Sequence, residues 1–137
     1  MIGIVVVTHR QLGEALIDAA KFILGSRPDL TVSVSIDLKE SADLLRKKIT
    51  NSIKEVDRKE GVLLLTDMFG GTPSNLSYSF LEEGKIEVIS GVNLPVLIKA
   101  VESRGELALV ELAKTVESYG QNSISLASRI LKGNKKS

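Results

Sequence analysis

The feature that most constrains the fold is a regular alternation of short apolar runs with longer segments of helical periodicity. Residues 2–7 read IGIVVV, a continuous apolar run rich in β-branched side chains. Such a run is typical of a strand buried on both faces of a parallel sheet. Three further strands are predicted at residues 31–36, 62–65 and 86–89. Because apolar and polar side chains alternate in 31–36, that strand is expected nearer an edge of the sheet.

Helices are predicted between these strands and after the last of them. The first has one apolar face that ends before Gly25, formed by Leu12, Leu16, Ala19, Ala20 and Ile23. The second begins at Asp37 or Ser41 and carries an apolar stripe of Leu44, Leu45, Ile49, Ile53 and Val56.

A third helix is predicted with Thr72 as its cap and Pro73 at its first position, reaching Gly84 with Leu76, Phe80 and Leu81 facing inward. A fourth begins near Asn93 and buries Val96, Leu97, Ala100 and Val101. A fifth follows Gly105, with Leu107, Val110, Ala113 and Val116 on one face. Residues 123–127 are predicted as a short last strand, although Leu126, Ile130 and Leu131 fit a helix nearly as well.

Strands that alternate with helices predict an α/β fold: an open, mostly parallel sheet with helices on both faces and right-handed crossovers. The simplest order of four such strands is 2-1-3-4. Ligands bind such sheets at the carboxyl ends of the strands, where the strand order reverses. That point lies between the loop that holds His9 and the loop that holds residues 67–72, and the loop before Asn93 forms a third wall.

Composition narrows the functional class. A length of 137 residues with 43% hydrophobic side chains predicts one domain over residues 1–132, followed by a polar tail at 133–137. The net charge of +1 gives no sign of a nucleic-acid surface. The chain lacks cysteine, which excludes disulfides, iron–sulfur clusters and thiolate zinc sites, and its single histidine excludes a multi-histidine metal centre within one chain. No cofactor is expected. No apolar run approaches the roughly 20 residues of a membrane helix, and the short apolar start lacks a basic leader, which predicts a cytoplasmic protein without direct membrane insertion.

His9 is the one side chain suited to nucleophilic or proton chemistry near neutral pH. The alternative, from the histidine alone, is a chance surface or capping residue. Phosphoryl transfer through histidine requires one unprotonated ring nitrogen, while an acceptor holds the other. Asp67 is the best candidate for that acceptor, its alternative role being to cap its own turn.

The phosphoryl oxygens require hydrogen-bond donors. Gly70 and Gly71 let consecutive backbone N–H groups point at an anion, and Thr72 adds a hydroxyl at the start of a helix. Thr8 is a further candidate donor. The alternative is an ordinary Gly-Gly turn before a helix, with Thr8 merely ending its strand.

Two familiar phosphate-handling classes are disfavoured. The sequence contains no P-loop and no G-x-G-x-x-G after the first strand. A response-regulator receiver would hold magnesium with acids after the first strand, where this chain has Thr8, His9 and Arg10.

Three segments resemble one family, the mannose-type enzyme IIA of the bacterial phosphoenolpyruvate-dependent sugar phosphotransferase system. Residues 8–16, THRQLGEAL, are similar to its active-histidine segment, and residues 66–75, TDMFGGTPSN, to its second active-site loop. Residues 91–97, GVNLPVL, match a third segment after the fourth strand. The resemblance covers essentially the whole chain.

The resemblance implies a phosphohistidine carrier, a phosphotransferase component in sugar uptake or its regulation. His9 would accept a phosphoryl group from HPr, with Asp67 bonded to the imidazole, and pass it to an enzyme IIB on a separate chain. It also implies a homodimer in which the terminal strand is exchanged between the subunits' sheets. Arg10, Phe69 and Asn93 are the expected docking residues. Two alternatives stay open: the phosphotransfer subunit of a dihydroxyacetone kinase system, and a non-catalytic regulatory module of the same fold.

Overall fold

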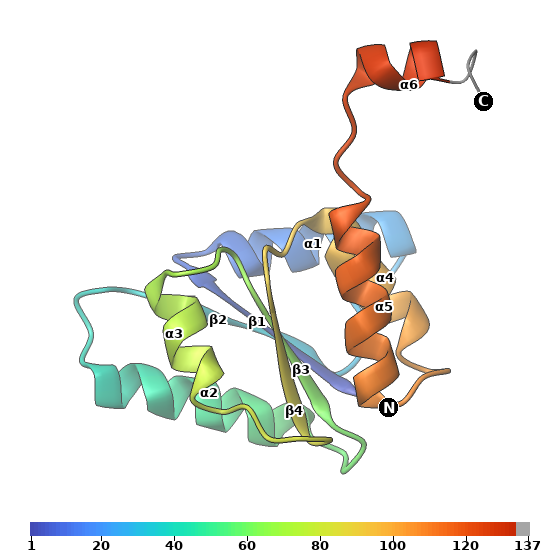
Figure 1. Cartoon of the computed structure of the whole chain (residues 1–137). Helices are drawn as coiled ribbons and strands as arrows, with labels where there is room; N and C mark the ends of the chain where they lie inside the picture. The colour runs from blue at the N-terminus through green and yellow to red at the C-terminus, as the bar shows by residue number, and fades with distance from the viewer. Residues whose placement is uncertain (134–137) are drawn as a thin grey trace.

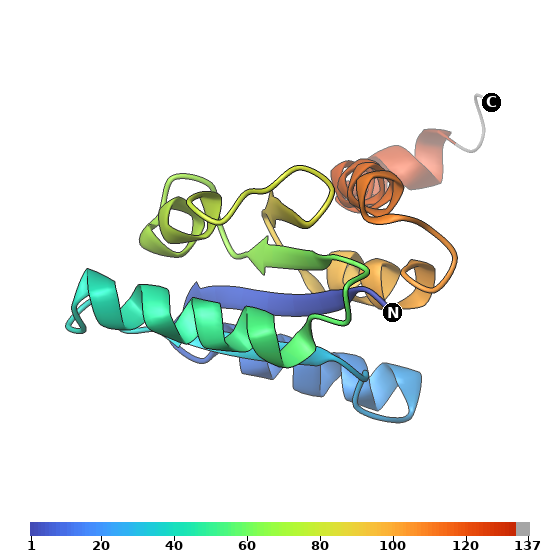
Figure 2. The ribbon, with the colours of Figure 1, turned by 90° about the horizontal axis from the view of Figure 1, so that it is seen from below.

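A computed structural model describes residues 1–133, in which four strands form one parallel sheet. The strands are β1 (Gly3–His9), β2 (Thr31–Ile36), β3 (Val62–Thr66) and β4 (Ile86–Ser90), in the order β2-β1-β3-β4. Figure 2 shows the arrowheads of β1 and β3 at the same end of the sheet. The predicted α/β fold and strand order are confirmed.

The helices lie on both faces of the sheet (Figure 1). Their bounds are α1 Leu12–Leu24, α2 Ala42–Val56, α3 Thr72–Tyr78, α4 Leu94–Ser103, α5 Leu109–Gln121 and α6 Ala127–Gly133. Helices α2 and α3 cover one face, and α1, α4 and α5 cover the other.

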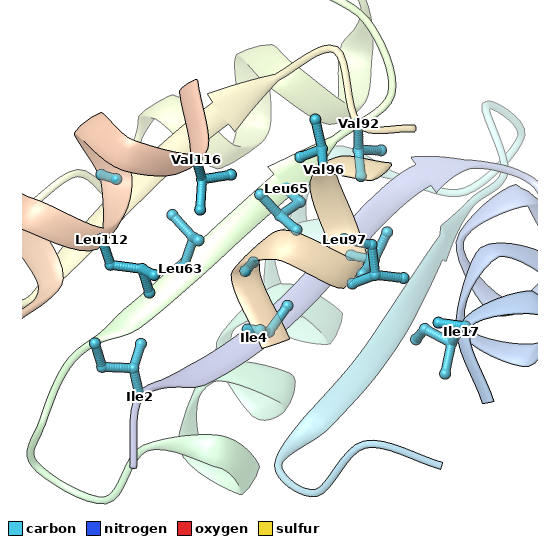
Figure 3. Packing of buried hydrophobic residues seen from close by; sticks show 14 of the residues in the cluster. Ile2, Ile4, Ile17, Leu63, Leu65, Val92, Val96, Leu97, Leu112 and Val116 are labelled. Carbon is cyan, nitrogen blue, oxygen red and sulfur yellow. The ribbon is translucent and has the colours of Figure 1, made fainter. Parts of the chain in front are cut away.

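Two apolar cores result, one on each face, because successive residues of a strand point to opposite sides. In β1, Ile4 and Val6 join the core beneath α1, α4 and α5, while Val5 and Val7 join the core beneath α2 and α3. Figure 3 shows the larger core, in which Leu97 and Leu112 from the helices pack over the sheet. Burial on both faces explains why β1 and β3 read as unbroken apolar runs.

Two helix starts are fixed by side-chain caps. The Ser41 hydroxyl accepts a hydrogen bond from the Leu44 N–H at 3.2 Å, which identifies Ser41 rather than Asp37 as the cap of α2. The side-chain amide oxygen of Asn93, Oδ1, accepts from the Val96 N–H at 2.9 Å, as expected for the start of α4.

Several predicted inward positions are wrong. The buried residues of α1 are Gly13, Ile17 and Ala20, whereas Leu12 and Ile23 are exposed. Leu44 in α2 and Val110 in α5 are also exposed. Since 3.6 residues make one turn, a stripe inferred from leucine and isoleucine spacing can be displaced by one position around the helix.

The third helix also differs from its prediction. Gly71 occupies the capping position without a side-chain hydrogen bond, Thr72 is the first helical residue, and α3 ends at Tyr78 rather than near Gly84. Residues 79–85 form turns, and Leu81 is exposed. Pro73 within the first turn is compatible with either register because its missing N–H is not needed there.

The described part of the C-terminal segment, residues 123–133, forms no strand. Residues 124–126 have no regular structure, and α6 begins at residue 127, so the helical alternative is confirmed for this part. The segment leads away from α5, and α6 stands clear of the sheet (Figure 1). Of the predicted tail, residues 134–137 lie outside the described residues, and Gly133 ends α6.

Arg104 holds the amino end of the sheet together. Its side chain is buried and donates to the Ile2 carbonyl at 3.2 Å and to the Thr31 hydroxyl at 3.3 Å, as well as to the Asp29 carbonyl. Burial lowers the pKa of the Arg104 guanidinium. This charge therefore ties α4 to β1 and β2 at the end of the sheet opposite to His9.

Among residues 1–133, none of the helices has the length and apolar character needed to cross a bilayer.

Candidate functional site

The site lies where β1 and β3 end side by side. These strands are hydrogen-bonded neighbours, with Val7 opposite Thr66 in the register. His9 is the last residue of β1, and Asp67 directly follows β3. Parallel strands end at the same edge of a sheet, so 57 intervening residues bring the two side chains to one place.

Asp67 holds both the backbone and the ring of His9. Its Oδ2 lies 2.8 Å from His9 Nδ1 and accepts a hydrogen bond from the His9 backbone N–H at 2.9 Å. A carboxylate only accepts, so in the neutral ring Nδ1 carries the proton and Nε2 is left with its lone pair. The His9 side chain is 37% exposed and that of Asp67 is 11% exposed. The predicted pair of His9 and Asp67 is therefore in contact, with the carboxylate largely buried and the imidazole partly exposed.

Gly71 lies against the free edge of the His9 ring. A β-carbon at this position would stand 3.0 Å from His9 Cε1 and 3.6 Å from Nε2. Because Gly71 has no side chain, the space beside His9 Nε2 stays open. Gly70 is required for a different reason, because its φ of 86° lies in the left-handed region that favours glycine.

The turn beside the ring carries unused donors. Among contacts within residues 1–133, the backbone N–H groups of Gly70, Gly71 and Thr72 donate no hydrogen bond. The Thr72 hydroxyl is half-buried and likewise makes no side-chain hydrogen bond to the described part of the chain. Consecutive amides of this kind can bind an anion.

Two predicted site residues have other tasks in this structure. Thr8 is completely buried, and its hydroxyl accepts from the Gly13 N–H at 2.8 Å. It therefore joins β1 to α1 and does not line the mouth of the site, by which we mean the exposed surface around His9 Nε2. The Asn93 amide caps α4 and also donates to the Ser123 hydroxyl at 3.3 Å. Both side chains stabilise the walls of the site; neither is free to face a ligand or a partner.

The other two predicted docking residues are exposed. Phe69 is 79% exposed, and its ring lies at a centroid distance of 6.3 Å from the ring of Tyr78. Arg10 is exposed and adopts a positive φ of 48°, a conformation uncommon for a side chain of this size. Both residues adjoin the turns that carry His9 and Asp67.

Sequence reasoning missed a cluster of hydroxyl groups beside the second loop, two of which, those of Thr66 and Ser74, are buried. The hydroxyls of Thr66, Ser74 and Ser90 lie within hydrogen-bond distance of one another, and that of Tyr78 lies within this distance of Ser90. Ser74 also donates to the Met68 carbonyl. Serine and threonine are common on surfaces and in caps, so their types alone do not distinguish an interior network. The only available signal is that Thr66 and Ser90 each directly follow a predicted strand.

Comparisons with known proteins identify the family of the chain. The profile of the family described as "PTS system fructose IIA component" matches residues 3–117. The "PTS system fructose-specific EIIA component" of Bacillus subtilis is 31% identical over 132 residues, covering 96% of this chain and 90% of that protein. The "PTS system mannose-specific EIIAB component" of Escherichia coli is 32% identical over 106 residues, which are 77% of this chain but only 32% of that longer protein.

The fold of this chain also matches that of a solved structure. The crystal structure of phosphotransferase system component EIIA from Streptococcus agalactiae superposes with a TM-score of 0.83 at 27% identity, covering 93% of this chain and 98% of that one. Because the family profile spans most of the chain and a relative above 30% identity is matched over nearly its whole length, this chain belongs to the fructose and mannose IIA family and is a phosphotransfer component of a sugar phosphotransferase system.

Proposed function

We propose that this protein is a phosphohistidine carrier in which His9 Nε2 accepts a phosphoryl group from HPr and passes it to an enzyme IIB subunit. The observation that carries the proposal is the 2.8 Å contact between His9 Nδ1 and Asp67 Oδ2. It commits one ring nitrogen to the carboxylate and leaves the exposed nitrogen as the nucleophile.

In the transfer, the Nε2 lone pair forms a bond to phosphorus while the nitrogen–phosphorus bond of the donor's phosphohistidine breaks. The proton on Nδ1 stays where it is, and positive charge develops on the His9 ring. The Asp67 carboxylate stabilises that charge and keeps the ring oriented, since Oδ2 also holds the His9 backbone at 2.9 Å. Release to the acceptor is the same step in reverse.

The unused donors beside the ring suit the oxygens of the transferred group. We assign this role to the backbone N–H groups of Gly70 and Gly71 and to the N–H and hydroxyl of Thr72. Donors held in place before reaction stabilise the transition state without reorganisation. Thr8 acts indirectly, because its hydroxyl fixes the start of α1 behind His9.

Partner docking is assigned to the exposed side chains around this mouth. Phe69, Met68 and Leu12 present apolar surface there, and Arg10 adds a positive charge. HPr and enzyme IIB would contact this surface in turn, because both must bring a phosphoryl acceptor or donor to Nε2. This exchange places the protein in the cytoplasm.

A homodimer is part of the proposal. The β4 edge of the sheet has no strand partner in the described chain, and a groove of about 410 Å³ runs beside it between Tyr78 of α3 and Glu117 of α5. The C-terminal segment meanwhile exposes Ile124 and Leu126. An unpaired edge and an exposed extended segment suit pairing between two copies of the chain.

Sedimentation analysis tests the dimer. The full chain is expected at twice its monomer mass, and a variant that ends at Asn122 is expected as a monomer. A full chain that stays monomeric at micromolar concentration would contradict this part of the proposal.

The carrier function is tested by incubating the protein with enzyme I, HPr and phosphoenolpyruvate. We expect one acid-labile phosphoryl group on the wild type and none on His9→Ala. Label that persists on His9→Ala would refute the assignment. Transfer of the label to an enzyme IIB, and none to a nucleotide bound by a dihydroxyacetone kinase, distinguishes this function from the kinase-linked alternative; a regulatory module without carrier function would take no label.

A further inference from the structure

A cluster of four hydroxyl groups is hydrogen-bonded to the loop that carries Asp67. Ser74, in the first turn of α3, is completely buried, and its hydroxyl donates to the carbonyl of Met68, the residue that follows Asp67. The same hydroxyl lies 2.6 Å from that of Thr66 and 3.0 Å from that of Ser90. The Tyr78 hydroxyl lies 2.7 Å from Ser90 and completes the cluster.

The directions of these hydrogen bonds follow from counting protons. A hydroxyl donates once, and a carbonyl oxygen only accepts, so the Ser74 proton is committed to Met68. Ser90 must then donate to Ser74, and Tyr78 must donate to Ser90. Thr66, which also lies 3.0 Å from Ser90, shares its proton between Ser74 and Ser90.

The cluster is therefore a directed chain that runs from Tyr78 through Ser90 and Ser74 to the Met68 carbonyl. Ser74 is its junction, because it accepts from two hydroxyls and is the donor that reaches the loop. Chains of this kind polarise their members and hold one geometry when all donors are used. Asp67 lies between the two fixed points of the loop, Thr66 and Met68.

We infer that Ser74 is a positioning residue for phosphotransfer: its hydroxyl fixes the Met68 peptide and thereby holds the Asp67 carboxylate on His9 Nδ1. Ser74 does not touch the imidazole or the transferred group. This inference rests on the proposed carrier function, and it adds a residue from outside the mouth to the machinery.

α3 offers a matched control in Ser77. This serine is also completely buried on α3, but its hydroxyl has no hydrogen-bond partner in the described part of the chain. Ser77→Ala and Ser74→Ala therefore remove the same atom from the same helix, and only Ser74→Ala breaks the chain to the loop.

The first readout is the tautomer of His9, measured by nitrogen-15 NMR on the unphosphorylated protein. Wild type and Ser77→Ala are expected to show the Nδ1–H tautomer alone. Ser74→Ala is expected to show a mixture with the Nε2–H tautomer, because a loosened Asp67 no longer selects one ring nitrogen. A merely structural role for Ser74 would leave the tautomer unchanged in the folded variant.

The second readout is the rate of phosphorylation by HPr. For Ser74→Ala we expect kcat to fall about 10-fold with an unchanged KM for HPr, since a displaced catalytic group costs rate more than docking. Ser77→Ala should remain within about twofold of wild type. Tyr78→Phe removes the outermost donor but keeps the ring, so its rate should lie between those of Ser74→Ala and Ser77→Ala. It replaces Ser74→Ala in the test if that variant does not fold.

Equal tautomer populations and equal rates for Ser74→Ala and Ser77→Ala would overturn the inference. For an unfolded Ser74→Ala, equality of Tyr78→Phe with wild type in both readouts would overturn it. Absence of phosphorylation in the wild type would instead refute the carrier function, whereas the tautomer comparison can still be made in that case.

Discussion

Gly71→Ala tests the geometry of the site with a single methyl group. Gly71 has a φ of −89°, so alanine fits its backbone without strain. The new β-carbon would lie 3.0 Å from His9 Cε1, whereas ordinary contact begins at 3.4 Å. The ring must therefore retreat by about 0.4 Å, against the 2.8 Å bond that ties it to Asp67.

The expected loss of rate follows from that displacement. A misplacement of 1 Å costs about 100-fold, so 0.4 Å corresponds to roughly sixfold if the logarithm of the rate scales linearly. The methyl group also stands 3.6 Å from Nε2, on the side where the transferred group must fit. Roughly sixfold is thus the minimum fall expected in the initial rate of labelling from phosphoenolpyruvate through enzyme I and HPr.

Other glycines provide the controls. Gly105→Ala adds a methyl group in open space at a position without a positive φ and should leave the rate unchanged. Gly70→Ala also meets no atom within 4 Å, but its φ of 86° strains the turn. Gly25→Ala introduces a similar strain far from the site, at a φ of 92°. If Gly71→Ala were phosphorylated as fast as Gly105→Ala, Gly71 would not border the reacting nitrogen, and the reasoning would be refuted.

Three further predictions concern charged groups. Asp67→Asn should slow phosphorylation of His9 by roughly 10²- to 10³-fold while circular dichroism stays unchanged, because the amide cannot stabilise the charged ring; a wild-type rate would remove the carboxylate from the mechanism. Arg104→Met should lower the free energy of unfolding in urea by about 2–4 kcal/mol, because buried carbonyls lose their donor; a change below about 0.5 kcal/mol would contradict its role in the fold. Hydrogen bonds from Arg27 and Ser33 lower the pKa of Glu14 below its ordinary 4.5, so their stabilisation is complete above pH 4.5 and is lost as the pH falls through the lower folded value. Since the Glu14 side chain is half exposed, Glu14→Gln should reduce this acid-induced loss by only a few tenths of a kcal/mol, and an unchanged acid titration curve would contradict the assignment.

The meeting of His9 with Asp67 could be predicted because it depends on topology rather than on detail. Parallel strands linked by right-handed crossovers leave few arrangements for four strands, and the simplest of them, 2-1-3-4, places the ends of β1 and β3 together. The apolar runs that define those strands are unambiguous in the sequence. The Gly-Gly turn was predictable for the same reason, since it directly follows β3.

The hydrogen-bond partners and the burial of individual side chains could not be predicted from topology. Thr8 in β1 and Asn93 before α4 lie at the predicted end of the sheet, but the Thr8 hydroxyl and the Asn93 amide each bond to a neighbouring backbone group, which residue type does not reveal. The burial of Ser74 depends on how α3 packs against β3, a tertiary contact that no local pattern records. Residues 123–127 match a strand and a helix almost equally, and no strand among residues 1–133 pairs with them.

The most direct test of the account is to identify which nitrogen carries the phosphoryl group, by nitrogen-15 and phosphorus-31 NMR of the protein phosphorylated through HPr. The account predicts a single phosphohistidine, His9, with the phosphorus bonded to Nε2 and the proton still on Nδ1 beside Asp67. Phosphorus on Nδ1, or on any residue other than His9, would contradict it.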